Sequence, residues 1–264
     1  MKQNLQFFLL FGLLFTLAAC EEGVLGPRQP FCQEERQENS NGSSFDRFYN
    51  NDRITDLYAS ANGNLLYYHQ FTYDDKGRVI ENNYHDMQNN TVSPPEIIAY
   101  DEKGNWVKST VTYSNGNEVF YTIEYDAQNQ MKKLTSSSKR AGAVSVNFTI
   151  DYDWEGGNNV KRTYISSVMR QEITYEFDLS RQNKRRKEQE KLAFLSLAVA
   201  HNRNMYRKYT TISTDIASGA VTSTVQNFEY EYNSQGYPIQ LTRTTTTNSA
   251  SPVTTTTLFH YSCE

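Results

Sequence analysis

The residue types that most often do chemistry are sparse in this chain of 264 residues, and their spacing matches no familiar reaction site. The four histidines lack the i,i+3 or i,i+4 spacing of metal ligands: His69, His85, His201 and His260. Neither a Gly-x-Ser-x-Gly motif nor a P-loop or Cys-x-x-Cys motif occurs. We therefore expect no enzyme activity, no metal and no cofactor.

Paired acidic residues are the other candidates for chemistry. Asp74-Asp75 and Asp101-Glu102 each follow a tyrosine at an expected turn. A glycosidase needs two carboxyl groups that face one another across a cleft, whereas an acid at a turn caps backbone N–H groups. We favour turn caps. A hydrolase with an atypical site would require two carboxylates, or a histidine and a carboxylate, that converge in an open cavity.

Aromatic residues are the remaining candidates, because the chain has 19 tyrosines. Trp106 and Trp154 each follow a Tyr-Asp turn, near a sheet rim where an aromatic ring can face solvent. With Tyr67 and Tyr73 they are the candidate ligand-facing aromatics for a glycan or an apolar molecule. The alternative, which we favour for the repeat tyrosines, is packing along an inner face with the hydroxyls bonded to backbone or water.

These tyrosines belong to a repeat. A Tyr-Asp dipeptide closes a short alternating segment at four places: Tyr73-Asp74, Tyr100-Asp101, Tyr125-Asp126 and Tyr152-Asp153. The steps between them are 27, 25 and 27 residues, which is the scale of a repeat unit. Glycine follows three places after the acid at Gly77 and Gly104, with Asn129 in the third unit, so each unit predicts a β-hairpin turn.

Within each unit apolar and polar residues alternate with period two. Val144, Val146, Phe148, Ile150 and Tyr152 share one face of a strand, and polar residues occupy the other. Such alternation indicates an antiparallel sheet with one buried face. The tyrosine and the residue two places before it are therefore predicted to point inward in each unit.

The repeats predict a wide sheet. Roughly a dozen to fourteen strands between Asp52 and Tyr261 would have to curl, because strand twist accumulates. We expect an all-β antiparallel meander curled into a closed or nearly closed barrel, with a flattened sandwich as the alternative. Residues from about 183 to 200 are rich in helix formers and predict one short helical insert, either a plug or lid or a surface loop.

The N-terminus predicts export. Residues 1–19 read as a signal peptide, and Leu17-Ala18-Ala19-Cys20 resembles a bacterial lipobox. That resemblance implies acylation of Cys20, for example with palmitate, and membrane attachment through the lipid. Residues 20–44 read as the lipidated cysteine and a flexible polar tether, and residues 45–264 as the barrel domain.

Two further properties bear on partners and compartment. A net charge of −4 argues against nucleic-acid binding. With Cys20 committed to lipid, Cys32 and Cys263 remain, and an exported compartment permits a disulfide between them. Two unpaired thiols are the alternative.

The Tyr-Asp units resemble the YD repeats of Rhs-type proteins, which build β-sheet shells. Together with the lipobox, Tyr73 to Val79, Tyr100 to Asn105 and Tyr232 to Pro238 resemble more closely a family of Bacteroidetes lipoproteins of unknown function with a porin-like β-barrel fold. The family carries no assigned catalytic residues. The residues Glu21-Glu22 resemble the signal for the outer face of the outer membrane, so we favour the cell surface over the periplasmic face.

Polar residues on the expected outer faces predict a water-soluble barrel on a lipid tether rather than a membrane-spanning one. The leading hypothesis is a non-enzymatic cell-envelope lipoprotein that binds a glycan, an apolar ligand or an envelope partner. The alternative is a structural scaffold or subunit of an outer-membrane complex, and an atypical hydrolase is the third hypothesis.

Overall fold

The structure is a computed structural model that describes residues 32–50, 53–184 and 202–263. Every regular element in these ranges is a β-strand, and Cys32–Ser262 forms one compact unit. The seventeen strands are β1 (Cys32–Asn39), β2 (Ser43–Asn50), β3 (Arg53–Ala61), β4 (Asn64–Tyr73), β5 (Val79–Asp86), β6 (Thr91–Val92), β7 (Glu96–Tyr100), β8 (Trp106–Thr112), β9 (Glu118–Tyr125), β10 (Met131–Arg140), β11 (Ala143–Glu155), β12 (Asn158–Ser166), β13 (Met169–Gln182), β14 (Asn204–Asp215), β15 (Val221–Tyr232), β16 (Pro238–Thr247) and β17 (Val253–Cys263).

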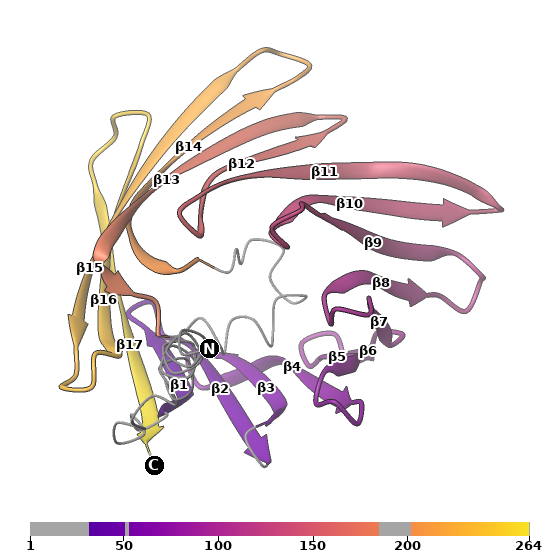
Figure 1. The fold of residues 1–264 in the computed structure, drawn as a ribbon, viewed down its shortest axis with the longest axis horizontal. Helices are drawn as coiled ribbons and strands as arrows, with labels where there is room; N and C mark the ends of the chain where they lie inside the picture. Colours follow the sequence, from indigo (N-terminus) through magenta and orange to yellow (C-terminus); the bar gives the residue numbers. More distant parts are fainter. Residues whose placement is uncertain (1–31, 51–52, 185–201, 264) are drawn as a thin grey trace, which may run out of the picture. The chain divides into compact units, whose positions relative to one another are not determined.

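The strands form one closed antiparallel barrel. Each strand pairs with the next along the chain, except that the two-residue β6 pairs only with β5, which also pairs with β7. The pairing of β1 with β17 completes the ring, so sixteen of the seventeen strands form it (Figure 1). Closure gives each of the sixteen strands of the ring, as far as the structure describes the chain, a partner on both sides, as the width of the predicted sheet required. The barrel is therefore confirmed over the flattened sandwich.

The seam between β1 and β17 is held by backbone and side-chain hydrogen bonds. Ser40 N donates to Thr256 O at 2.7 Å, and Thr256 N donates to Ser40 Oγ at 3.0 Å. Thr257 Oγ1 donates to Asn39 Oδ1 at 2.7 Å. These bonds satisfy the polar groups that two free edge strands would expose.

The Tyr-Asp turns have the predicted chemistry. Asp74 Oδ1 accepts hydrogen bonds from the backbone N of Lys76 at 3.0 Å and of Arg78 at 2.8 Å, and Gly77 has a φ of 77°. The third unit keeps the same turn because Asn129 adopts a φ of 63°. Asparagine tolerates this left-handed conformation better than other residues that carry a side chain. Both expectations about these turns are confirmed.

The buried side chains lie on one face of the sheet, here called the inner face. In β11, Ile150 and Tyr152 are 4% and 5% exposed, whereas Asp151 between them is exposed. The same alternation buries Phe71, Ile98, Ile123 and Phe228, as predicted. Tyr73, Tyr100, Tyr125 and Phe148 are partly buried and pack against that core.

The sheet begins earlier in the chain than we expected. Residues 32–44, which the composition placed in a flexible tether, form β1, a turn and the start of β2. A strand added to a sheet needs mainly backbone hydrogen bonds, so a polar segment can join it with few apolar side chains. Glu34 is buried and its carboxylate lies 2.6 Å from the Arg47 guanidinium, which compensates its charge.

The same segment explains the strand count. Seventeen strands exceed the expected dozen to fourteen, and removing β1, β2 and the two-residue β6 leaves fourteen.

The expected helical insert falls almost entirely on residues 185–201, which lie outside the described residues, and Asn183 and Lys184 are not helical. The signal peptide and Cys20 also lie outside them. Across the three described ranges, no helix is both apolar and long enough to span a bilayer.

Candidate functional site: an aromatic pocket on the inner face

The repeat tyrosines link neighbouring repeats at one rim of the barrel. Their hydroxyls donate hydrogen bonds to carbonyl oxygens in the preceding unit: Tyr73 to Ile54 at 2.6 Å, Tyr100 to Val79 at 2.8 Å and Tyr125 to Trp106 at 2.9 Å. In the next unit Trp154 Nε1 donates to Met131 O at 2.7 Å. The repeated tyrosine is thus a structural cross-link.

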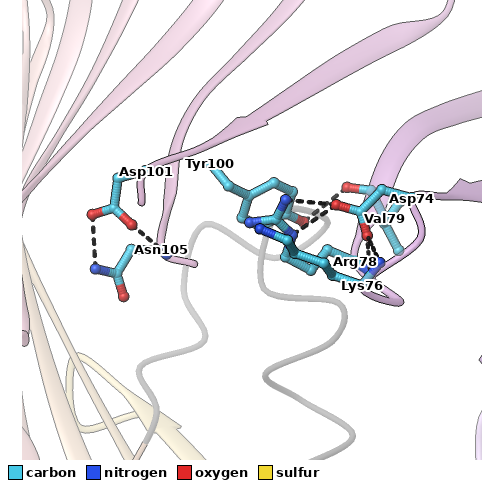
Figure 2. Close-up of polar contacts among 7 residues, drawn as sticks. All are labelled: Asp74, Lys76, Arg78, Val79, Tyr100, Asp101 and Asn105. Carbon is cyan, nitrogen blue, oxygen red and sulfur yellow. Dashed lines mark hydrogen bonds and ion pairs between the residues drawn. The ribbon is translucent and has the colours of Figure 1, made fainter. Parts of the chain in front are cut away.

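Figure 2 shows one of these links together with its turn. The Arg78 guanidinium lies 2.6 Å from the Asp74 carboxylate and 4.6 Å from the centroid of the Tyr100 ring. The hydrogen bonds that Arg78 donates to the Asp74 carboxylate, together with the positive charge of its guanidinium, hold the pKa of Asp74 below its usual value. Burial raises the pKa of Tyr100 to about 12, so its phenol is the neutral donor that the bond to Val79 requires.

The four candidate ligand-facing aromatics do not come together in a pocket. Trp106 is 6% exposed and belongs to the core cluster, so its ring is no platform for a ligand. Trp154 and Tyr73 are engaged in the rim links. Tyr67 is half-buried, with its ring centroid 5.5 Å from that of Tyr84 and 5.7 Å from that of His69. These residues stabilise the barrel.

His69 shows the same structural character, whereas His260 is half-exposed and lies 3.6 Å from the Glu38 carboxylate. His69 Nδ1 lies 2.8 Å from Asn82 Oδ1, and Asn82 Nδ2 donates to Glu96 at 3.1 Å. Burial lowers the pKa of His69. An amide therefore separates the imidazole from the carboxylate. Among the described residues no group of three metal-ligating side chains is found.

Two carboxylates do share one cavity, which has a volume of about 380 Å³. Glu38 and Asp46 both line it, as does Arg36. The Arg36 guanidinium lies 2.7 Å from the Glu38 carboxylate and 3.1 Å from that of Asp46. Because a guanidinium bridges them, these carboxylates are arranged as an ion-pair network rather than as an acid and a base that face a substrate.

A second cavity, with a volume of about 220 Å³, is lined by four aromatic residues of β14 and β15 and by residues of β16. We call it the aromatic pocket. Its lining residues are Asn183, Asn204, Met205, Tyr206, Tyr209, Phe228, Tyr230, Leu241 and Arg243. None of them carries a carboxylate.

The sheet register explains this grouping. Phe228 and Tyr230 point inward by the alternation of β15, and they lie opposite Arg243 and Leu241 of β16. Residues directly opposite one another in antiparallel strands share a face. The aromatic residues therefore share the inner face with one cation and one leucine.

A β-bulge adds the fourth ring. Tyr206 and Tyr209 are three residues apart, so in a regular strand they would point to opposite faces. In β14 the register shifts, because Tyr206 lies opposite Phe177 whereas Lys208 lies opposite Glu176. A bulge of this kind returns a side chain to the other face. The ring centroids of Tyr206 and Tyr209 accordingly lie 5.3 and 5.1 Å from that of Phe228.

Asparagine side chains fix the end of the pocket where β14 begins. Asn204 N donates to Asn158 Oδ1 at 2.9 Å, and Asn158 Nδ2 donates to Asn204 Oδ1 at 3.0 Å. Asn204 Nδ2 also donates to Arg181 O at 3.1 Å. Because these polar groups are buried and paired, this part of the lining is rigid.

Arg243 determines the charge of the pocket. Its Nε donates to Thr255 Oγ1 at 3.2 Å. Burial, then the neighbouring Tyr206, raise the pKa of Tyr209, and Arg243 opposes that rise. Tyr209 is thus a neutral phenol close to a guanidinium. The pocket offers aromatic faces, phenol hydroxyls and the guanidinium group of Arg243, and such groups bind a polar ring.

Solved structures of the same fold exist. A porin-like protein from Bacteroides uniformis aligns with a TM-score of 0.59 at 14% identity, covering 87% of this chain and 98% of that one. A porin-like protein from Bacteroides vulgatus aligns with a TM-score of 0.53 at 9% identity over the same shares. Identities this low support the barrel fold alone. No protein-family profile and no curated protein sequence matches this chain.

Proposed function

We propose that this protein is a non-enzymatic binding protein of the cell envelope, and that the aromatic pocket binds one sugar ring of a glycan. The observation that carries the proposal is the pocket itself, where Tyr209 and Phe228 stand beside Arg243. Aromatic faces with a few fixed polar groups are the usual lining of a small-molecule site.

The size of the pocket supports a single ring. Its volume of about 220 Å³ lies below the range of about 300 to 1,000 Å³ that is typical for drug-sized ligands. An extended apolar ligand would need more space and would leave Arg243 without a partner. A terminal sugar of a longer glycan meets both conditions.

The outer face supports a barrel surrounded by water. Half-exposed ion pairs lie there in the middle of the strands: Lys161 with Glu172 at 2.9 Å, and Lys208 with Glu176 at 2.9 Å. A membrane-spanning barrel instead carries an apolar band at this height. In this proposal the envelope attachment comes from acylated Cys20, which lies outside the described residues.

The location and the disulfide remain part of the proposal. Lipidation would place the protein on the outer membrane, with the cell surface favoured. The antiparallel pairing of β1 with β17 supports a bond between Cys32, where β1 begins, and Cys263, where β17 ends. The side chain of Cys263 lies outside the described part of the chain.

Binding of a set of neutral and acidic methyl glycosides, followed by saturation-transfer NMR on the purified protein, tests the proposal. We expect transfer to at least one sugar, and its loss in Tyr209→Ala. Tyr67→Ala is the matched control, because it removes a half-buried tyrosine from an aromatic cluster outside the pocket. No transfer to any sugar, or equal loss in both variants, would contradict the proposal.

A structural role is the second candidate. The links from Tyr73, Tyr100 and Tyr125 to the preceding units support it, because they give the most repetitive residues a part in holding the barrel together. A scaffold subunit would need only that rigidity. Cross-linking in intact cells followed by pull-down would recover one stoichiometric envelope partner in that case, and the Tyr209→Ala variant would retain it.

A further inference from the structure

We infer that the sugar bound in the aromatic pocket is acidic, with a carboxylate on the ring as in a uronic acid. This inference rests on the proposed function and adds the chemical class of the ligand. Its basis is the charge of the inner face around Tyr209, where two guanidinium groups have no acidic partner among the described residues.

Arg243 differs from many arginines of the chain. Five arginines in the described residues lie within 3.3 Å of a carboxylate oxygen: Arg36, Arg47, Arg78, Arg170 and Arg207. Arg243 forms no ion pair within the described ranges, and its Nε bond goes to a neutral threonine hydroxyl. Its charge is therefore available to a ligand.

Arg162 adds a second cation to the same face. It lies in β12 opposite Tyr152 and Ile173, both of which are buried. Its Nε is buried and has no hydrogen-bond partner, although buried polar groups are almost always paired. Arg162 and Arg243 both act on the Tyr209 phenol, since each opposes the rise of its pKa. Arg243 lines the pocket beside Tyr209, and Arg162 adds positive charge to the same face.

A ring carboxylate fits this arrangement. A guanidinium binds a carboxylate through two parallel N–H···O bonds, and such charge-assisted bonds are about twice as strong as neutral ones. The sugar ring would lie against Tyr209, which is only partly buried, while its carboxylate meets Arg243. Hydrogen bonds to charged groups change affinity by about 10- to 100-fold, which is enough to select an acidic sugar over its neutral analogue.

The test compares methyl β-glucuronide with methyl β-glucoside, which differ only in the carboxylate. NMR titration of the purified protein at pH 7 should give at least tenfold tighter binding of the glucuronide. Arg243→Gln should abolish that preference, and Arg243→Lys should retain part of it because it keeps the charge but loses the fork. Arg170→Gln is the control, because it removes an arginine that pairs with Glu172 on the outer face.

The outcomes separate the two proposals. Equal affinity for both glycosides in the native protein would overturn the acidic ligand and leave the sugar site standing. Binding of neither would overturn both. Hexanoate bound as tightly as the glucuronide would show a carboxylate site without sugar recognition and would also overturn the inference. If the circular dichroism spectrum shows that the Arg243→Gln variant is unfolded, the affinity of the native protein for the glucuronide is measured at rising salt concentration instead. An ion pair between Arg243 and the carboxylate predicts that this affinity falls as salt rises.

Discussion

Truncation of Ile150 to alanine should destabilise the barrel strongly. Ile150 lies opposite Leu134 and Tyr164, and it is 4% exposed while Leu134 is 0% exposed. The substitution removes three side-chain carbon atoms, and at ~0.8 kcal/mol each their lost burial costs about 2.4 kcal/mol of transfer free energy. The rigid strands cannot close the gap, and a residual cavity of roughly 60 Å³ adds about 1.4 kcal/mol. The expected loss in unfolding free energy is therefore about 4 kcal/mol.

Urea unfolding followed by tryptophan fluorescence measures this loss. The midpoint should fall while the slope with denaturant stays constant, because the surface exposed on unfolding is unchanged. Val146→Ala is the matched control on the same strand, since Val146 is 62% exposed, and it should change the unfolding free energy by less than about 0.5 kcal/mol. A loss below about 1 kcal/mol for Ile150→Ala, or equal losses in the two variants, would refute the assignment of the inner face.

Three further predictions concern the rim and the cysteines. Tyr100→Phe removes the hydrogen bond to the preceding unit and should cost about 0.5 to 1.5 kcal/mol of unfolding free energy in the same urea assay, and an unchanged midpoint would contradict the structural link. Burial raises the pKa of Tyr100 and Tyr175 from 10.0 to about 12, so between pH 10 and pH 12 the folded protein binds more protons than the unfolded chain. The contribution of these tyrosines to the unfolding free energy is therefore complete below pH 10 and is lost as the pH rises through 12. An unfolding midpoint that stays constant from pH 10 to pH 12 would contradict this. Mass spectrometry of the mature protein should find acylated Cys20. Thiol titration after unfolding without reductant should find Cys32 and Cys263 unreactive, and two reactive thiols would refute the disulfide bond between them.

Much of the barrel follows from local chemistry that the sequence displays. Alternation identifies the inner face from Phe148 to Tyr152, because the strand period is two whatever the partner strand. It is wrong for Val144 and Val146, which it placed on the same face: the register shifts between Phe148 and Val146, and both valines are exposed. The Asp74 turn is equally local, since its capping bonds span four residues. The strand β1 escaped prediction because it pairs with β17 at the other end of the chain, and because composition cannot reveal the buried Glu34–Arg47 ion pair between β1 and β2.

The aromatic pocket was predictable only in part. Phe228 and Tyr230 alternate as inner-face residues, and the register of β15 with β16 brings Arg243 beside them. The bulge that turns Tyr206 inward leaves no sequence signal such as a glycine, so the three-residue spacing alone does not reveal that Tyr206 and Tyr209 share a face. The position of Trp106 and Trp154 next to a turn did not show where they would point, because a tryptophan there can also fold back onto the core, as both do here.

The most direct test of the sugar site is a crystal structure of the protein soaked with methyl β-glucuronide. We expect a single sugar ring between β14 and β16, stacked on Tyr209, with its carboxylate on Arg243. A ring bound elsewhere on the barrel, or a pocket that stays empty at a ligand concentration that saturates binding in solution, would contradict it.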